Sequence, residues 1–318
     1  MKSMPAQFNR MVRRLRLRHF ELLTLLAQER TVRAAARRMA LTQPAVSKML
    51  REIEDCFGTP LFERSRSGVT ANAAGERLIR HAVIAMNETR ALGEEVDAIV
   101  RHGASMLRVG TLPMTPRIPE AVALLRKRIP RTMVQVREAR IIDLIPALRD
   151  GELDCVVGGL PPETLQNADI DKLHVEHLAP DRIYVVASPS HRLSGRRRFH
   201  WRQLEGELWV LPPRQSMLRR AVIDAHHQAG LAPPEPDVEL TSPFFLTTLL
   251  ALDSDLLGVM RKEHAQTDVA SGALSIISVT PAIALPPITL ITRRGHRSEA
   301  LAEFGAALRK IPPGRLAQ

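Results

Sequence analysis

One segment of the chain, residues 72–103, predicts a single helix that is too long for the domain that precedes it. Asn72 can cap its start, and Gly103 follows its end. Along it, small or apolar side chains recur in steps of four and three, a 3.5-residue period: Leu78, Ala82, Ala85, Thr89, Leu92, Val96 and Ile99. A helix of about 30 residues is roughly 45 Å long, so a small domain cannot bury that stripe. We expect two copies of the helix to pair; the alternative is an ordinary amphipathic helix packed on its own C-terminal domain.

The positive charge of the chain is concentrated at one end. The net charge is +11, of which residues 1–70 contribute +8, with 14 Lys/Arg against 6 Asp/Glu. A small basic module on a near-neutral body indicates a polyanionic partner. An anionic membrane is the alternative, but no stretch reaches the ~18 apolar residues that span a bilayer. Double-stranded DNA is therefore the expected partner, with no membrane contact.

The basic module has the pattern of three helices. Residues 17–27 carry apolar side chains at helical spacing. Thr31 can cap a second, small-residue helix, and Thr42 a third, with Pro44 in its first turn and Gly58 at its end. A turn of about three residues separates the last two helices, which is the spacing of a helix-turn-helix.

Two kinds of structure follow the third helix. Residues 61–70 predict a two-stranded wing with Arg64 and Arg66 near its tip. From residue 106 onward strands and helices alternate, which favours a mostly parallel α/β architecture. The expected strands are 107–110, 133–138, 154–158, 183–187, 208–211, 237–240, 256–260 and 288–292. The expected helices are 119–128, 142–149, 216–229, 244–252 and 299–310.

Two runs of residues, 34–48 (AAARRMALTQPAVSK) and 57–64 (FGTPLFER), closely resemble the signature of LysR-type transcriptional regulators. The resemblance continues more loosely through the linker helix into a periplasmic-binding-protein-like domain. It implies a winged helix-turn-helix domain at residues 1–71, a dimerisation helix at 72–103, and an effector-binding domain at 104–318. That last domain would be two-lobed, with lobe I at 104–181 and 284–318 and lobe II at 182–283.

The resemblance also implies what the chain does. A small-molecule effector in the C-terminal domain would switch a sequence-specific DNA-binding regulator that is not an enzyme and needs no cofactor. By family analogy the assembly is a homotetramer, whereas the sequence itself argues only for pairing, at least into a homodimer. A basic N-terminus with no continuous apolar stretch after it indicates no secretory signal, so we expect the cytoplasm.

The expected DNA contacts lie mainly on the third helix, which should enter the major groove. Gln43 can bond adenine bidentately, Ser47 a base or a phosphate, and Lys48 or Arg51 a guanine edge or a phosphate. For Gln43 and Ser47 the alternative is helix-start chemistry, and for Arg51 a solvated charged face. The full expected set is Thr31, Arg33, Thr42, Gln43, Pro44, Ser47, Lys48, Arg51, Arg64 and Arg66. The sequence departs from the family at three positions, where Gly, Ser/Thr and Thr are usual: Arg30, Arg33 and Asn72.

The resemblance also implies where the effector contacts lie: in the resembled fold two lobes close on a ligand, whose polar groups meet loops and helix N-termini. The expected effector contacts are Thr111, Met114, Thr115, Arg140, Ile141, Gln215, Ser216, Thr241, Ser242 and Phe244. A purely structural role is an equal alternative for each of them, and Phe244 or Phe245 is expected to pack in the core. An organic acid, an aromatic acid and a sugar remain open as the effector.

Other chemistries find little support in the sequence. His174 and His177 lie in an expected strand at i and i+3, so they face opposite sides and make a poor metal pair. Cys155 fits a small buried hydrophobe, and Cys56 lies near the end of the third helix, too far away in sequence to suggest a redox pair. Two rivals remain: an enzyme with an accessory DNA-binding head, and a non-specific architectural DNA-binding protein.

Overall fold

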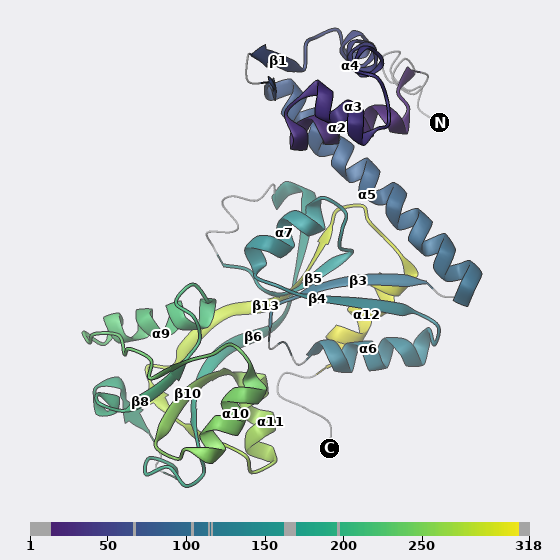
Figure 1. Cartoon of the computed structure of the whole chain (residues 1–318). Helices are drawn as coiled ribbons and strands as arrows, with labels where there is room; N and C mark the ends of the chain where they lie inside the picture. Colours follow the sequence, from purple (N-terminus) through teal and green to yellow (C-terminus); the bar gives the residue numbers. More distant parts are fainter. Residues whose placement is uncertain are drawn as a thin grey trace. The chain divides into compact units, whose positions relative to one another are not determined.

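The chain forms two compact units, which are described separately (Figure 1). The first comprises Met1–Arg101 and Arg149–Glu152, and the second His102–Leu148 and Leu153–Gln318. A computed structural model describes residues 14–65, 68–102, 105–113, 115, 117–161, 170–195 and 198–311.

The first unit contains a helical head with a two-stranded wing, as the sequence predicts. Its elements are α2 (Leu17–Glu29), α3 (Val32–Arg38), α4 (Gln43–Phe57), β1 (Phe62–Ser65), β2 (Gly68–Ala71) and α5 (Ala73–His102). Three expected caps are present. The side-chain oxygens of Thr31, Thr42 and Asn72 accept hydrogen bonds from the backbone N–H groups three residues later, at 3.2, 3.4 and 2.9 Å. Each bond satisfies a donor that the first helical turn otherwise leaves without a partner.

The head is held together by one apolar core. Leucine side chains of α2, small residues of α3 and one face of α4 fill it: Leu22, Leu23, Leu26, Ala35, Ala36, Val46, Leu50 and Ile53. Alanines at positions 35 and 36 let α3 approach its neighbours closely because a methyl group adds little bulk.

The apolar stripe of α5 divides into two parts. Leu78 and Ala82 pack into the head core, so the head buries the first part of the stripe but not all of it. A long helix can rest its first turns on the domain it follows. Leu92, Val96 and Ile99 are 60, 48 and 53% exposed, so the remainder of the stripe is available to another surface.

The wing is attached to the turn between α2 and α3. Arg30 ends α2 in the left-handed conformation, with φ 56°, and its carbonyl oxygen accepts a hydrogen bond of 2.8 Å from the Val69 N–H. A Cβ at Gly68 would lie 2.2 Å from that oxygen, so only glycine fits there. The glycine that the resemblance leads us to expect at position 30 thus has a conformational reason, and Arg30 occupies the position under strain.

The second unit is built on a nine-stranded mixed sheet. The strand order is β4-β3-β5-β13-β6-β10-β8-β9, and β11 pairs with β6. The strands are β3 (Met106–Thr111), β4 (Met133–Glu138), β5 (Cys155–Gly159), β6 (Leu173–Ala187), β8 (Leu208–Leu211), β9 (Val238–Glu239), β10 (Leu256–Arg261), β11 (Ser275–Ile277) and β13 (Ile283–Arg293). A small separate sheet pairs β7 (Phe199–His200) with β12 (Val279–Thr280).

The expected mostly parallel sheet is correct only within each half. β4, β3 and β5 run parallel, and so do β10, β8 and β9. The long strands β6 and β13 pair antiparallel with each other and with their other neighbours. They pass from one half to the other and divide the sheet into lobe I, around β3–β5, and lobe II, around β8–β11.

Helices cover both faces of the sheet in each lobe (Figure 1). In lobe I one face is covered by α6 (Arg117–Arg128) and α12 (Glu299–Lys310), and the other by α7 (Ile141–Arg149). In lobe II α9 (Met217–Gln228) covers one face, and α10 (Pro243–Leu252) with α11 (Lys262–Ala270) the other. The sequence did not predict α11. This helix is mostly polar and has a single buried residue, Ala265, so it lacks the apolar spacing by which the other helices were recognised.

Candidate functional site

The outer face of α4 presents a row of polar side chains. Gln43, Ser47 and Arg51 are spaced four residues apart and therefore lie on one side of the helix. Gln43 and Arg51 are exposed and Ser47 is half-buried. The opposite side carries Val46 and Leu50, which are buried in the head core. The helix thus separates its packing face from a face that is free to meet a partner.

Local contacts hold the cations of this face along the helix. The Arg51 Nε donates to the Ser47 carbonyl oxygen at 3.3 Å, and the Lys48 Nζ lies 4.0 Å from a carboxylate oxygen of Glu52. The other carboxylate oxygen of Glu52 lies 3.7 Å from the Nε2 of His19, a residue whose pKa is lowered by burial. Exposed ion pairs of this kind contribute little to stability, so Lys48 can leave Glu52 at low cost.

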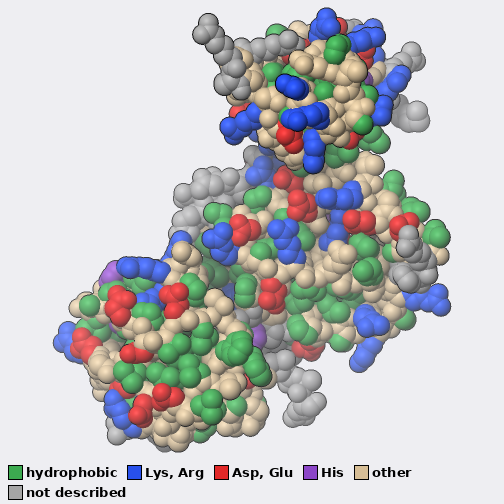
Figure 2. Space-filling model, in the orientation of Figure 1, with side chains coloured by type: hydrophobic (Ala, Val, Ile, Leu, Met, Phe, Trp, Pro, Cys, Tyr) green, Lys and Arg blue, Asp and Glu red, His purple; other side chains and the backbone are tan. Residues whose placement is uncertain are grey.

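The remaining expected DNA contacts lie on α3 and the wing. Arg33 is exposed in the first turn of α3, and Thr31, which caps that helix, lies beside the wing, 3.4 Å from where a Gly68 Cβ would be. Arg64 pairs with Val69 across the wing; its side chain lies outside the described part of the chain, as does Arg66. Figure 2 shows Lys and Arg side chains over the visible face of the head.

The expected effector contacts in lobe I are largely engaged with the protein itself. The Thr111 hydroxyl donates to the Val157 carbonyl oxygen at 3.1 Å, and the Thr115 hydroxyl to that of Leu112 at 2.9 Å. The Arg140 Nε bonds Asp143, one turn further along the start of α7, at 2.9 Å. Ile141 is half-buried, and Met114 lies outside the described residues.

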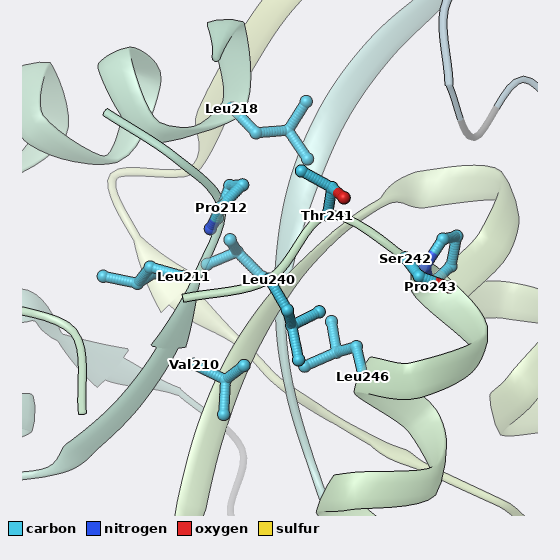
Figure 3. A pocket seen from close by; sticks show the side chains of 10 residues that line it. Val210, Leu211, Pro212, Leu218, Leu240, Thr241, Ser242, Pro243 and Leu246 are labelled. Atoms are coloured by element: carbon cyan, nitrogen blue, oxygen red, sulfur yellow. The ribbon is translucent and has the colours of Figure 1, made fainter. Parts of the chain in front are cut away.

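In lobe II the expected contacts surround two helix N-termini. Ser216 and Ser242 cap α9 and α10 by accepting hydrogen bonds from backbone N–H groups, at 3.1 and 3.4 Å. Thr241 and Ser242 line a small hollow at the end of β8 and the start of α10 (Figure 3). Its other walls are apolar: Val210, Leu211, Pro212, Leu218, Leu240, Pro243, Leu246 and Val259. Gln215 is exposed beside the start of α9.

The two phenylalanines of α10 correct one expectation. Phe244 and Phe245 are 74 and 65% exposed, with their ring centroids 5.9 Å apart. Neither packs in the core, because Leu246 and Leu250 form the buried side of α10. The helix is apolar on nearly all sides, so residue type alone cannot distinguish its core face.

Sequence reasoning missed a buried group of four charges, Arg117, Asp181, Arg261 and Glu263, which we call the junction cluster. The Arg117 Nε lies 2.6 Å from a carboxylate oxygen of Glu263, and the Arg261 Nε donates to Asp181 at 2.8 Å. Burial raises the pKa of Glu263, and Arg117 offsets part of that effect. The partners are 146 and 80 residues apart, so no local spacing could have signalled them.

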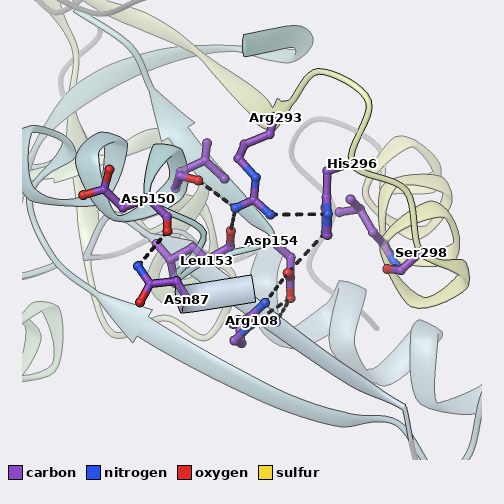
Figure 4. A network of polar contacts seen from close by, with 10 residues as sticks. Asn87, Arg108, Asp150, Leu153, Asp154, Arg293, His296 and Ser298 are labelled. Atoms are coloured by element: carbon purple, nitrogen blue, oxygen red, sulfur yellow. Dashed lines mark hydrogen bonds and ion pairs between the residues drawn. The ribbon is translucent and has the colours of Figure 1, made fainter. Parts of the chain in front are cut away.

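A second buried charge network lies within lobe I (Figure 4). The Asp154 carboxylate accepts hydrogen bonds from the backbone N–H of Arg108 at 2.7 Å and from its guanidinium at 2.8 Å. Nε2 of His296 lies 3.3 Å from the same carboxylate. Burial alone would raise the pKa of Asp154, but the bonds from His296 and Arg108 outweigh it and lower the pKa to about 2. This network fixes the start of β5.

The two cysteines are both free and buried. Burial raises the pKa of Cys155 far above its ordinary value, so its thiol stays protonated. Among the described residues, no three His, Cys, Asp or Glu side chains gather as a metal site would require. Nor does any helix in the described ranges have both the length and the apolar character needed to cross a membrane.

A winged helix-turn-helix joined through a long helix to a two-lobed α/β domain defines a DNA-binding regulator with an effector-binding domain. Comparison with known protein families agrees. Residues 101–311 match the LysR substrate binding domain, and residues 17–76 match the bacterial regulatory helix-turn-helix protein of the lysR family. The chain therefore belongs to the LysR family of transcriptional regulators, which are not enzymes. The expected family and fold class are confirmed.

Individual relatives are also transcriptional regulators. The chain is 27% identical over 267 residues to the transcriptional regulator GbpR of Azospirillum brasilense, covering 83% of this chain and 77% of that protein. It is 28% identical over 284 residues to the regulator PcaQ of Agrobacterium fabrum, covering 88 and 89%. Among solved structures, a full-length OxyR variant from Pseudomonas aeruginosa shares the fold with a TM-score of 0.61 and 22% identity, covering 94% of this chain and 99% of that one.

Proposed function

We propose that this regulator reads a promoter sequence with α4, pairs through α5, and is switched by a small molecule bound in its two-lobed domain. The observation that carries the proposal is the outward-facing polar row of Gln43, Ser47 and Arg51 on a capped helix whose opposite face is buried. A helix of this kind can enter the major groove without disturbing its own packing.

The chemistry of that row suits base edges. The Gln43 amide can bond adenine bidentately, Ser47 a base or a phosphate, and Lys48 or Arg51 a guanine edge or a phosphate. The wing arginines, Arg64 and Arg66, would contact the DNA phosphates or the minor groove beside the site. The charge of +8 over residues 1–70 supplies the attraction to DNA that does not depend on sequence.

Pairing follows from the second half of the α5 stripe. Leu92, Val96, Ile99 and Val100 are exposed apolar side chains on one helix, a costly arrangement in water. Two copies that cover them form a homodimer, and two dimers the tetramer that the family analogy suggests. A paired molecule reads a pseudo-palindromic site, with half-sites one helical turn or a multiple apart. The three parts would be residues 1–71, 72–103 and 104–318, and the protein would act in the cytoplasm.

The effector would bind between the lobes, near the starts of α9 and α10. Helix N-termini favour anionic or polar oxygen atoms, and the hollow beside Thr241 and Ser242 offers apolar walls to a carbon skeleton. An organic acid, an aromatic acid or a sugar meets both conditions. A ligand at 100 times its dissociation constant adds roughly 2.7 kcal/mol of stability, so a thermal-shift screen of such compounds would identify the class.

Two substitutions test the DNA-binding assignment. Gln43→Ala should reduce the preference for the promoter sequence by about tenfold, because a bidentate base contact contributes about 1–3 kcal/mol of discrimination. Arg66→Ala should instead weaken binding to all DNA and lower the salt slope by about one. Binding would be measured to promoter and random duplexes at several salt concentrations.

The same measurement separates the proposal from its rival. Equal, sequence-blind losses from both variants would contradict the assignment of α4 to base reading. If the parent protein binds random DNA as tightly as the promoter at ~0.15 M salt, where the non-specific contribution is weakened, the chain is an architectural protein instead. Sedimentation of the full chain tests pairing, and a monomer would refute it.

A further inference from the structure

The connection between the two lobes passes through two strands with prolines at the same level. β6 and β13 pair from Leu285↔Asp181 to Ile288↔Ala179, with a break in register between these pairs. Pro180 lies in β6 at this break, and Pro286 and Pro287 lie in β13. Proline lacks a backbone donor, so the ladder is weakest here. The lobes can therefore bend at this level, and contacts beside it decide whether they do.

The junction cluster lies beside this break and contacts both lobes. Arg117 belongs to α6 of lobe I and is 2% exposed. Its Nε contacts Glu263 of α11, in lobe II, at 2.6 Å, while its Nη1 donates to the Ile311 carbonyl oxygen of lobe I at 2.9 Å. One guanidinium thus links the end of α12 to the opposite lobe.

The second pair of the cluster reinforces this link at the crossing strand itself. Arg261 ends β10 of lobe II, and its guanidinium contacts the carboxylate of Asp181, the residue that follows Pro180 in β6, at 2.8 and 2.6 Å. Its Nη2 also lies 3.6 Å from where a Cβ at Gly159, the last residue of β5 in lobe I, would be. Both cations of the cluster therefore reach both sides of the junction.

The Arg117–Glu263 pair can both form and break, because its electrostatic attraction is largely offset by the cost of removing the two charges from water. Removing two charges from water costs about as much as their mutual attraction returns, unless every remaining polar atom also finds a partner. In the junction cluster Arg117 Nη2 and Glu263 Oε2 are buried without a hydrogen bond. Parting the lobes would let water reach both atoms. The pair therefore fixes the geometry of the closed lobes without making separation prohibitive.

We propose that Arg117 and Glu263 form a latch between the lobes, which holds them together and must open before they separate. The latch rests on the proposed function in one respect: it would set how readily an effector enters and leaves the cleft. The link between the lobes does not depend on the proposed function, because the Arg117–Glu263 ion pair joins a residue of one lobe to a residue of the other. The ion pair of Arg108 with Asp154, by contrast, stays within lobe I.

The latch can be tested by measuring the distance between the lobes in the full-length chain. Spin labels on Lys127→Cys in α6 and Asp224→Cys in α9 report that distance by double electron–electron resonance, and both positions are exposed. The native cysteines are buried, and dilution with unlabelled protein restricts the signal to pairs within one chain. We expect Glu263→Gln, which keeps the shape of the side chain, to raise the ratio of separated to closed lobes by at least about tenfold, because it leaves the buried charge of Arg117 uncompensated.

Two further variants make the result decisive. Asp154→Asn breaks a buried ion pair within one lobe and should leave the distance distribution unchanged. Arg117→Gln combined with Glu263→Gln should shift it no further than Glu263→Gln alone, because both remove the same contact. An unchanged distribution in Glu263→Gln, an equal shift in Asp154→Asn, or a larger shift in the double variant than in Glu263→Gln would overturn the latch. Promoter discrimination by the same proteins tests the proposed function separately, since that property depends on α4.

Discussion

The head and the two-lobed domain organise their polar residues in opposite ways. In the head, α4 places its polar residues outward and its apolar residues inward, so the proposed DNA-binding face and the packing face use different side chains. In the two-lobed domain, the hydroxyls of Thr111, Thr115 and Ser216 bond the backbone. Its buried charges join segments as far apart as 146 residues.

The two regions therefore differ in whether a substitution can alter binding without altering stability. If the outer face of α4 reads DNA as proposed, substitutions there should change DNA preference while the fold stays intact. In the two-lobed domain a polar substitution removes a cap, a strand contact or an ion pair, and so alters stability together with any ligand contact. Three sets of substitutions test this separation, in decreasing order of the free energy involved.

The first sharpens the separation within the head. Leu50→Ala removes a fully buried side chain from α4 and should lower the free energy of unfolding of the head by about 3 kcal/mol. Arg51→Ala, its neighbour on the exposed face, should change that free energy by no more than about 0.5 kcal/mol while weakening DNA binding. Urea denaturation and a DNA titration of each variant measure the two effects. Equal destabilisation by both variants would mean that the two faces of α4 are not independent.

The second concerns the buried charges of lobe I and their dependence on pH. The folded-state pKa of Asp154 is about 2, below the unfolded value of about 3.9. Its ionisation therefore contributes about 2 kcal/mol to stability above pH ~4, and this contribution is lost as the pH falls towards 2. Asp154→Asn should lose it at neutral pH and flatten the acid limb of a stability curve measured by denaturation.

A surface pair supplies the control for that prediction. Glu176→Gln removes the partner of Arg309, a pair whose arginine is half exposed. Its effect should stay below about 1 kcal/mol because solvent screens the interaction. If the two substitutions cost the same, burial would not be what makes the Asp154 network strong.

The third and smallest prediction relieves backbone strain in the head. Arg30 and Ala40 adopt positive φ values of 56° and 52°, which favour glycine. Arg30→Gly and Ala40→Gly should each raise the free energy of unfolding by about 1 kcal/mol, seen as a higher thermal midpoint of the head. Ala74→Gly, in the first turn of the helix α5, is the matched control and should lower it by a similar amount. A loss of stability in Arg30→Gly would show that its side chain contributes more than the strain costs.

Much of the architecture could be predicted because it depends on short-range patterns. Helical spacing of apolar residues and caps such as Thr42 and Asn72 located the helices of the head, since each depends on residues three or four positions apart. The antiparallel course of β6 and β13 could not be predicted in this way. Strand direction depends on which segments meet in space, and those segments lie more than 90 residues apart.

The candidate sites also differ in whether they depend on short-range patterns or on contacts between distant segments. The row Gln43, Ser47 and Arg51 was predictable from a period of four and a capped helix start. Exposure of Phe244 was not, because α10 is apolar on nearly every side and only packing selects the face that Leu246 buries. The junction cluster left no pattern in the sequence at all.

The amino-acid sequence alone specified the family, the winged helix-turn-helix head, the long helix and the exposed polar face of α4. It could do so because these features repeat within one or two helical turns. How far the α5 stripe is buried, which way the crossing strands run and which buried charges become partners emerge only from the folded structure. Each of these depends on the free energy of contacts between distant segments, which exists only once the chain has folded.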